Sequence, residues 1–331
     1  MGLRKIPEIP IASLHDYLKC VEDVESEFGH ECRDAAGGFW TTYRGHGDKR
    51  YLLVPSLFRK IESTPAFYVR EQLLIQETLR LMPEEFVGLT AFQKLAKLQH
   101  FNLPTRLLDV TTNPLVALFF ASGGPDNRDG EVIVVPRMPL FSEYSEPVNW
   151  ISEWAINGDW NIRSGAAIAN AARFIPADSP SPAAFEPLID ALTSPFLAVR
   201  PSYTNVRLRA QSGAFLLTGM KMFAWQNEEL GDKGFAEQNF LFKPWLHDPI
   251  ADSPFPVPQE SYHSRFVVPA EAKTAIRRQL DRVNINEATL FPDPEHRARY
   301  IADGFLNGTF GAATVPNIHL EWPSAEAGAK D

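Results

Sequence analysis

The sequence contains few cysteines and no segment that is typical of a membrane protein. Among 331 residues there are two cysteines, Cys20 and Cys32, and both lie near the N-terminus. We expect both to be reduced thiols in a cytoplasmic protein, and a four-cysteine zinc ribbon is excluded. The chain has no long apolar run, and its first residues, MGLRKIPEIP, show no signal-peptide pattern. We therefore expect no membrane among the partners.

The chain also has fewer basic than acidic residues. The chain has 32 Lys and Arg against 41 Asp and Glu, which gives a formal net charge of −9. This balance disfavours nonspecific nucleic-acid binding as the main activity. The motifs GxxxxGK[ST], GxGxxG, HExxH and GxSxG are absent, which excludes several common classes of nucleotide-binding and hydrolytic site. His296 lies close to Asp293 and Glu295, but acidic residues suit the first turn of a helix, so no metal is expected.

The residues that are present predict a sizeable core and a mixture of helices and strands. Hydrophobic residues make up 44% of the chain, with 23 Phe. The elements do not alternate regularly, which favours an α+β fold with a mixed, mostly antiparallel sheet packed with helices. The helix over 115–121 is apolar on every side and is expected to be buried. We predict helices over 14–28, 67–82, 92–101, 115–121, 270–283 and 294–305, and strands over 39–44, 51–54, 105–110, 131–135, 196–199, 207–210, 214–218 and 265–268.

Polar side chains concentrate in two segments that also contain strongly apolar residues. The first is FWTTYRGH, Phe39 to His46, and the second is KLQHFNLPTRLLDVTTNPLVALFFA, Lys97 to Ala121. Buried polar groups need hydrogen-bond partners, so ordinary core segments do not carry this many at their edge. These two segments are therefore the candidate functional site. Within the second segment the polar residues of interest are Gln99, His100, Thr105, Arg106, Asp109 and Thr111.

These segments resemble the FRG domain, a bacterial family named after a Phe-Arg-Gly signature. The signature is similar to Tyr43-Arg44-Gly45 here, with Tyr in place of Phe, and the block QHFNLPTRLLDVTTNPLVALFFA resembles the longest motif of the family. YLLVPSLFRK, NVRLRAQSGAFLL and NINEATLFPDPEHRARYIADGF are also similar to family segments. The resemblance implies an N-terminal helical lead at 1–36, an FRG domain at 37–310 with a helical insertion at about 140–195, and a C-terminal tail at 311–331.

The order of the motifs is in turn similar to that of the ADP-ribosyltransferase superfamily. A strand ending in Arg44 precedes a strand with Asp109 and Thr111, and Gln211 precedes a third strand. This likeness implies an ADP-ribosyltransferase-like sheet and an enzyme that uses NAD as its nucleotide substrate. The enzyme would be an ADP-ribosyltransferase or NAD glycohydrolase, acting as a toxin or antiphage effector, with a protein or nucleic acid as acceptor. No glutamate accompanies Gln211, so a noncatalytic ligand-binding or protein-interaction module stays open.

The resemblance also assigns roles. Arg44, His100, Asp109 and Gln211 are the expected catalytic residues. Arg44 would hold a phosphate or ribose through its planar fork, Asp109 would stabilise positive charge on the ribose, and His100 would carry a proton. Each residue also has a possible structural role. Arg44 could form an ion pair with Asp109, and His100 could cap a helix. Asp109 could bind Arg106 or loop amides, and Gln211 could occupy a strand bulge. The expected NAD-binding residues are Tyr43, Arg44, Gly45, Gln99, Thr105, Arg106 and Thr111, with Tyr43 or Phe101 stacking on nicotinamide.

Overall fold

The computed structural model shows an α+β fold, as predicted. It describes residues 8–28, 39–51, 53, 55–59, 67–157, 197–203, 205–218 and 265–306. Cys20 is a free thiol. Cys32, most of the predicted insertion (158–195) and the predicted C-terminal tail at 311–331 lie outside these residues.

The described strands form one mixed sheet in the order β1-β7-β4-β2-β3-β6-β5. Five of the seven pairings are antiparallel, whereas β1–β7 and β4–β5 are parallel. The prediction of a mixed, mostly antiparallel sheet is therefore confirmed. The strands are β1 (Glu8–Pro10), β2 (Phe39–His46), β3 (Leu107–Thr111), β4 (Gly130–Ser142), β5 (Leu197–Arg200), β6 (Gly213–Leu217) and β7 (Arg265–Val268).

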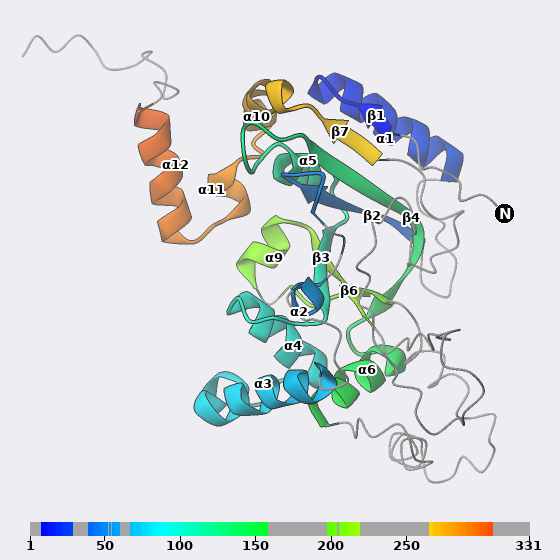
Figure 1. Cartoon of the computed structure of the whole chain (residues 1–331), viewed down its shortest axis with the longest axis vertical. Helices are drawn as coiled ribbons and strands as arrows, with labels where there is room; N and C mark the ends of the chain where they lie inside the picture. The colour runs from blue at the N-terminus through cyan, green and yellow to red at the C-terminus, as the bar shows by residue number, and fades with distance from the viewer. Residues whose placement is uncertain are drawn as a thin grey trace, which may run out of the picture.

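The long strand β4 closes part of this sheet into a ring. Its first half pairs with β2 and β7, and its last residues pair with β5. Strands β4, β2, β3, β6 and β5 therefore follow one another around a small curled sheet (Figure 1). Apolar side chains fill its inner face, as expected for so small an enclosure. They are Leu53, Leu108, Val110, Ile133, Val135, Ala198, Ala214 and Leu216.

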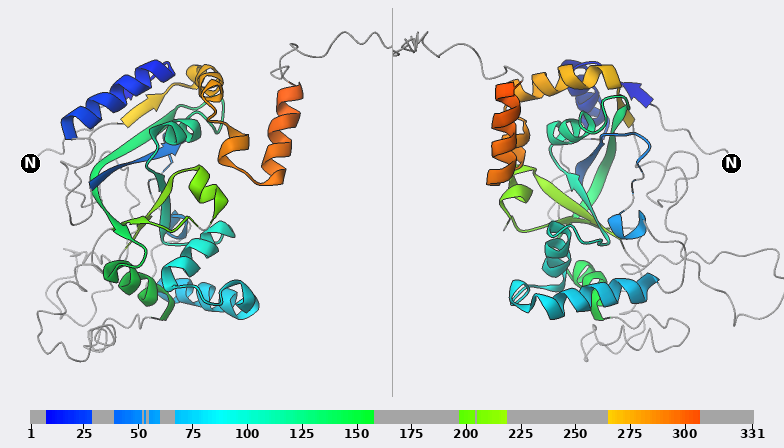
Figure 2. Two further views of the ribbon diagram at one scale, coloured as in Figure 1. Left: turned by 180° about the vertical axis from the view of Figure 1, so that it is seen from behind. Right: turned by 60° about the vertical axis from the view of Figure 1, so that its left-hand side comes forward.

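Two groups of helices cover the outside of the sheet (Figures 1 and 2). Helices α1 (Leu14–Phe28), α5 (Pro114–Ala121) and α10 (Lys273–Arg282) pack with β2, β4 and β7. Helices α3 (Phe67–Leu81), α4 (Ala91–His100) and α6 (Glu146–Asn157) pack against β3, β5 and β6. Within the described part of the chain, no helix is both long and apolar enough to cross a bilayer.

The remaining helical segments are short or peripheral. Helix α12 (Pro294–Leu306) stands away from the sheet and is joined to it through α11 (Glu287–Leu290) (Figure 2). The others are α2 (Ser56–Arg59), α9 (Val206–Ala210) and the 3-10 turns η1 (Pro83–Glu85) and η5 (Ala270–Ala272).

Local sequence signals explain the elements that carry the polar motifs. Thr90 and Gln93 form a capping box at the start of α4. The side chain of Asn113 accepts a hydrogen bond from the Leu115 amide, 3.0 Å away, and Pro114 occupies the first turn of α5. Most of α5 is buried, including the fully buried Leu118, so this prediction is confirmed.

Two predicted strands are wrong. Tyr51 and Leu53 lie in bends and not in a strand. Leu53 is buried among the apolar side chains on the inner face of the curled sheet. The segment 207–210 belongs to helix α9, whose N-cap is Asn205. The Asn205 side chain accepts a hydrogen bond from the Arg207 amide at 2.8 Å. An alternation of only four residues cannot distinguish a strand from one helical turn, and the cap decides here.

The N-terminal lead is built into the fold. Strand β1 pairs with β7, and Tyr17 of α1 is fully buried, with its ring edge against Phe266. The Tyr17 hydroxyl donates to the carbonyl of Pro114 at the start of α5. The lead therefore supports the element that follows the candidate site.

Candidate functional site

Arg44 and Asp109 meet where β2 and β3 diverge. Among the described residues, these strands share a single register pair, Tyr43 with Thr111. Next to this pair, Nη1 of Arg44 donates to the main-chain carbonyl of Asp109 at 2.6 Å and lies 3.9 Å from its Oδ2. The Arg44 side chain thus binds a carbonyl of β3 that would accept a main-chain hydrogen bond from β2 if the two strands stayed paired.

The two charged groups differ in exposure. The Arg44 side chain is 22% exposed, whereas that of Asp109 is 61% exposed. The guanidinium is therefore oriented by main chain, while the carboxylate is mostly in solvent. A fixed cation beside an exposed anion can receive a ligand that carries both signs of charge, and a guanidinium suits a phosphate especially well.

Thr111 and Gln211 are also brought together, but by contacts that stabilise the fold. The Thr111 hydroxyl donates to the Gln211 carbonyl at 2.7 Å and accepts a hydrogen bond from the Asn113 amide at 3.0 Å. The Gln211 side-chain amide donates to the carbonyl of Leu290 at 3.0 Å. These bonds join β3, α5, α9 and α11 at one end of the sheet.

Gln99 and Thr105 bind each other, and His100 lies at the surface. The Thr105 hydroxyl donates to the Gln99 side chain and accepts a hydrogen bond from the Leu107 amide at 3.2 Å. This arrangement fixes the turn between α4 and β3. His100 is exposed, with its ring 6.1 Å from that of Phe101. In the described structure no contact joins His100 to Arg44 or Asp109, so His100 is not brought into this site.

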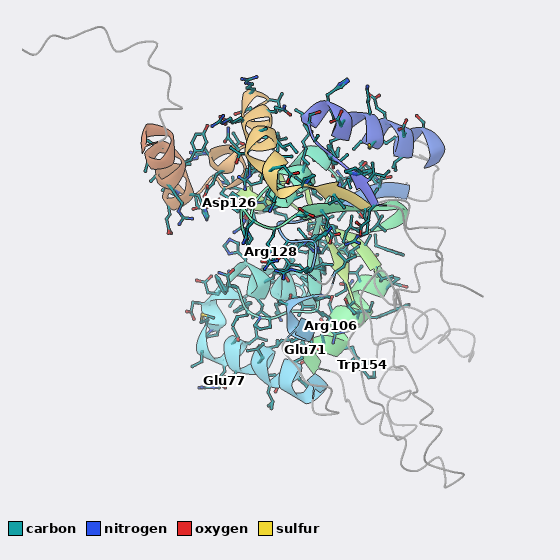
Figure 3. The ribbon with its side chains drawn as sticks, turned by 45° about the horizontal axis from the view of Figure 1, so that its top comes forward. Glu71, Glu77, Arg106, Asp126, Arg128 and Trp154 are labelled. Carbon is teal, nitrogen blue, oxygen red and sulfur yellow. The ribbon has the colours of Figure 1, made fainter. Side chains whose placement is uncertain are left out.

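The placement of Arg106 corrects its expected role in NAD binding. Its side chain is fully buried and forms a bidentate ion pair with Glu71 of α3, with Nε 2.7 Å from Oε1 (Figure 3). Its Nη1 donates to the carbonyl of Thr218 at 3.1 Å. Arg106 therefore connects β3 to α3 and β6. The alternative in which Asp109 pairs with Arg106 is also wrong, because Glu71 takes that place.

Tyr43 and Gly45 also serve the core rather than a ligand. Tyr43 is 1% exposed among the side chains of α1 and α5, so neither face of its ring can stack on nicotinamide. This burial, with the negative charge of Glu25, raises the pKa of the Tyr43 phenol well above its usual value. A Cβ atom at Gly45 would lie 1.9 Å from the carbonyl oxygen of Ala117, so Gly45 allows α5, not a ligand, to approach β2.

A buried ionic network, which no local sequence pattern indicates, lies beside the site. His46 Nδ1 lies 3.1 Å from Oε1 of the fully buried Glu131. Arg265 Nε donates to the other Glu131 oxygen at 2.7 Å, and its Nη1 donates to Glu8 at 2.9 Å. The network ties β2, β4, β7 and β1 together. Within the described residues, no three His, Cys, Asp or Glu side chains are grouped so that they could hold a metal ion.

The fold and the site define an α+β domain with an arginine presented where two central strands separate. The sequence identifies it further: residues 40–130 match the family model of the FRG domain, so this part of the chain is an FRG domain. The match contains Arg44, His100 and Asp109, whereas Gln211 lies outside it. No curated protein and no solved structure matches the chain.

Proposed function

We propose that this FRG domain binds NAD beside Arg44 and Asp109 and breaks the bond between nicotinamide and ribose. The activity would be that of an ADP-ribosyltransferase or an NAD glycohydrolase. The observation that carries the proposal is the Arg44 guanidinium, anchored at 2.6 Å on the β3 main chain and 3.9 Å from a largely exposed carboxylate. NAD offers both complementary charges, an anionic pyrophosphate and a cationic nicotinamide ring.

The chemistry assigned to each group follows from its charge. Arg44 would bind the pyrophosphate or a ribose oxygen through charge-assisted hydrogen bonds. When the glycosidic bond breaks, its electron pair leaves with nicotinamide and positive charge develops on the ribose. Asp109 would stabilise that charge without further reorganisation. Loss of NAD, or transfer of ADP-ribose to a protein or nucleic acid, would harm a cell, which suits a toxin or an antiphage effector.

A second candidate function is a noncatalytic nucleotide-binding or interaction module. The observation that favours it is the engagement of two groups expected to be catalytic or to bind NAD. The Gln211 amide is bound to Leu290, and the Thr111 hydroxyl is bound to the Gln211 carbonyl. Such a module would keep the Arg44 contact and bind NAD without releasing nicotinamide.

The replacement Arg44→Lys tests the proposal because it keeps the charge and removes the planar fork. Losing one charge-assisted hydrogen bond of about 1.5–3 kcal/mol should weaken NAD binding or turnover by a factor on the order of 10 to 100. Arg80→Lys, on the exposed side of α3, is the matched control and should leave both unchanged. Calorimetry with NAD, nicotinamide release and melting temperature are measured on the same preparations.

Three results decide between the candidate functions. A lower melting temperature with unchanged NAD turnover in Arg44→Lys would make Arg44 a purely structural partner of Asp109 and refute the ligand role. Binding of NAD by the parent protein without nicotinamide release would support the noncatalytic module. Absence of NAD binding in the parent protein would refute both assignments to NAD.

A further inference from the structure

Helix α10 is anchored to the loop that follows α5. Lys273, the first residue of α10, donates from Nζ to the carbonyls of Gly47, Gly123 and Pro125 at 2.6, 2.8 and 3.1 Å. These three bonds hold the start of α10 at the loop. Arg277 lies four residues later, so its side chain leaves α10 on the same face as that of Lys273. The contacts of Lys273 therefore fix the position of Arg277 beside the loop.

The guanidinium of Arg277 is packed between an aromatic ring and a glycine. Its central carbon lies 4.1 Å from the ring centroid of Phe119 of α5, which is stacking distance. A Cβ atom at Gly123 would lie 2.6 Å from Nη2 of Arg277, so the missing side chain at Gly123 leaves the room that the guanidinium occupies. Phe119 is itself only 5% exposed. The guanidinium thus has a fixed position at the end of α5.

This guanidinium has no anionic partner in the part of the chain that the structure describes. Nε of Arg277 is buried and lacks an acceptor, and Nη1 and Nη2 form no hydrogen bond or ion pair. Because Nη1 and Nη2 are not among the buried atoms that lack a partner, they reach solvent. Burial lowers the pKa of Arg277, while the charges of Glu287 and Asp126 oppose this shift. A guanidinium that has lost part of its hydration attracts an anion more strongly than one in open water.

A second arginine lies over the neighbouring ring of the same aromatic cluster. The guanidinium carbon of Arg207, from α9, is 4.5 Å from the ring centroid of Phe291. The centroids of Phe291 and Phe119 are 6.4 Å apart, so the two guanidinia lie over adjoining rings. Arg207 is exposed and, among the described residues, its side chain has no carboxylate partner either. Two cations without counter-ions are therefore held on one aromatic cluster.

The two carboxylates nearest in charge to Arg277 do not neutralise it. Glu287 lies 2.9 Å from Nδ1 of His296 and 3.7 Å from Nη1 of Arg299, so it is engaged with α12. Asp126, labelled in Figure 3, is exposed in the turn after α5, where water and salt screen its charge. An incoming anion therefore meets two guanidinia without counter-ions and one exposed carboxylate.

We propose that Arg277, with Arg207 beside it, forms a second ligand site, which binds the phosphate group of a small molecule. A guanidinium whose two Nη atoms face outward donates two parallel hydrogen bonds to oxygens of one phosphate. A phosphate monoester, with about 1.5–2 negative charges at pH 7, balances two cations better than a singly charged carboxylate does. A nucleic-acid strand fits less well, because a chain with a net charge of −9 repels a long polyanion. The site shares no residue with the Arg44–Asp109 pair and does not depend on NAD chemistry.

A purely structural role would make Arg277 a cover for the ring of Phe119. Arg278 supplies the matched control, since it is the next residue of α10, has the same charge and is exposed. Gly123→Ala supplies an independent test, since the added Cβ would displace Nη2 while the arginine remains in the chain. A cover predicts changed stability with unchanged phosphate affinity, whereas a ligand site predicts weaker phosphate binding.

The experiment titrates the full chain with inorganic phosphate by calorimetry at constant ionic strength, and measures the rise in melting temperature that phosphate causes. Arg277→Gln should lower the phosphate affinity by a factor on the order of 10 to 100, the usual effect of losing a charge-assisted hydrogen bond. Gly123→Ala should also lower it, and Arg207→Gln should lower it less. Arg278→Gln should bind phosphate as the parent does.

Two further probes identify the source of the phosphate group. Tighter binding of adenosine monophosphate than of inorganic phosphate, with the same dependence on Arg277, would support the site and identify a nucleotide as its ligand. Equal affinities would support the site and identify the free ion. Tighter binding of a single-stranded oligonucleotide than of either, again dependent on Arg277, would overturn the assignment to a small molecule.

Four other results would overturn the site itself. The first is a parent protein that does not bind phosphate, and the second is an equal loss of affinity in Arg277→Gln and Arg278→Gln. The third is a loss in Arg44→Lys but not in Arg277→Gln, which would place the phosphate at the other site. If Arg277→Gln does not fold, Gly123→Ala and Arg207→Gln decide, and parental phosphate affinity in both would be the fourth.

Discussion

The buried ion pair between Arg106 and Glu71 gives the sharpest prediction about stability. The two side chains are 0% and 1% exposed, and the pair joins β3 to α3. Glu71→Ala would leave the guanidinium buried without this carboxylate, while its hydrogen bond to the Thr218 carbonyl remains. Removing one partner of a buried pair costs about 3–5 kcal/mol, because the other charge stays buried without its counter-ion. On the scale of a domain of 150–250 residues, this is a fall of about 6–20 °C in melting temperature.

The same helix supplies the control for this experiment. Glu77 of α3 pairs with Arg80, and both side chains are largely exposed, at 57% and 66% (Figure 3 labels Glu77). Glu77→Ala should therefore have the same midpoint of urea unfolding as the parent protein, because water screens the charges of an exposed ion pair. The double replacement Glu71→Leu with Arg106→Met should recover much of the lost stability, since it removes both buried charges.

Urea unfolding followed by circular dichroism measures all of these variants on one scale. The reasoning would be refuted if Glu71→Ala shifted the midpoint no more than Glu77→Ala does. A second refuting result would be a stable Arg106→Met protein with strongly weakened NAD binding. Arg106 would then act on a ligand rather than on the fold.

Two further predictions concern Gly45 and Asp48. Gly45→Ala should lower the melting temperature strongly, because the added Cβ would lie 1.9 Å from the Ala117 carbonyl oxygen of α5. An unchanged melting temperature would show that α5 can move away from β2 at little cost. The hydrogen bonds from Arg50 hold the pKa of the Asp48 carboxyl well below its usual value, so Asp48 stabilises the fold above about pH 4 and this contribution is lost as pH falls below it. Asp48→Asn should therefore reduce the dependence of stability on pH between about 4 and 2 in acid titrations, and an unchanged acid transition would contradict this.

Local signals explain which parts of the fold could be predicted. The strand at β2, the capped helix α5 and the termination of α4 each depend on residues next to one another, such as Asn113 with Pro114. The RLRA alternation of segment 207–210 wrongly predicts a strand, because it spans only four residues and because the helix cap at Asn205 lies just before it. The closure of the sheet by β4 and β5 depends on pairing between distant segments, which periodicity does not reveal.

The sequence indicated which segments come together, but not which partners their side chains contact. Arg44 and Asp109 do meet, as their positions near strand ends indicated. The role of Arg106 depends on Glu71, which is 35 residues away in the sequence, and that of His46 on Glu131, which is 85 residues away. Whether an arginine binds a ligand or a carboxylate of its own fold is decided by such distant partners, which a single sequence does not display.

The pairing of β1 with β7 has a consequence for how the chain acquires its fold on the ribosome. Glu8 and Arg265, which form an ion pair across these strands, are 257 residues apart. When synthesis has reached residue 130, where β4 only begins, β2 still lacks its neighbour β4 and β3 still lacks its neighbour β6. Contacts this distant in sequence form late and slowly. Completion of the sheet must therefore wait for synthesis of β7. Until then the growing chain has unpaired strand edges, and a chaperone or a neighbouring nascent chain can bind the edge of β4 in place of β7.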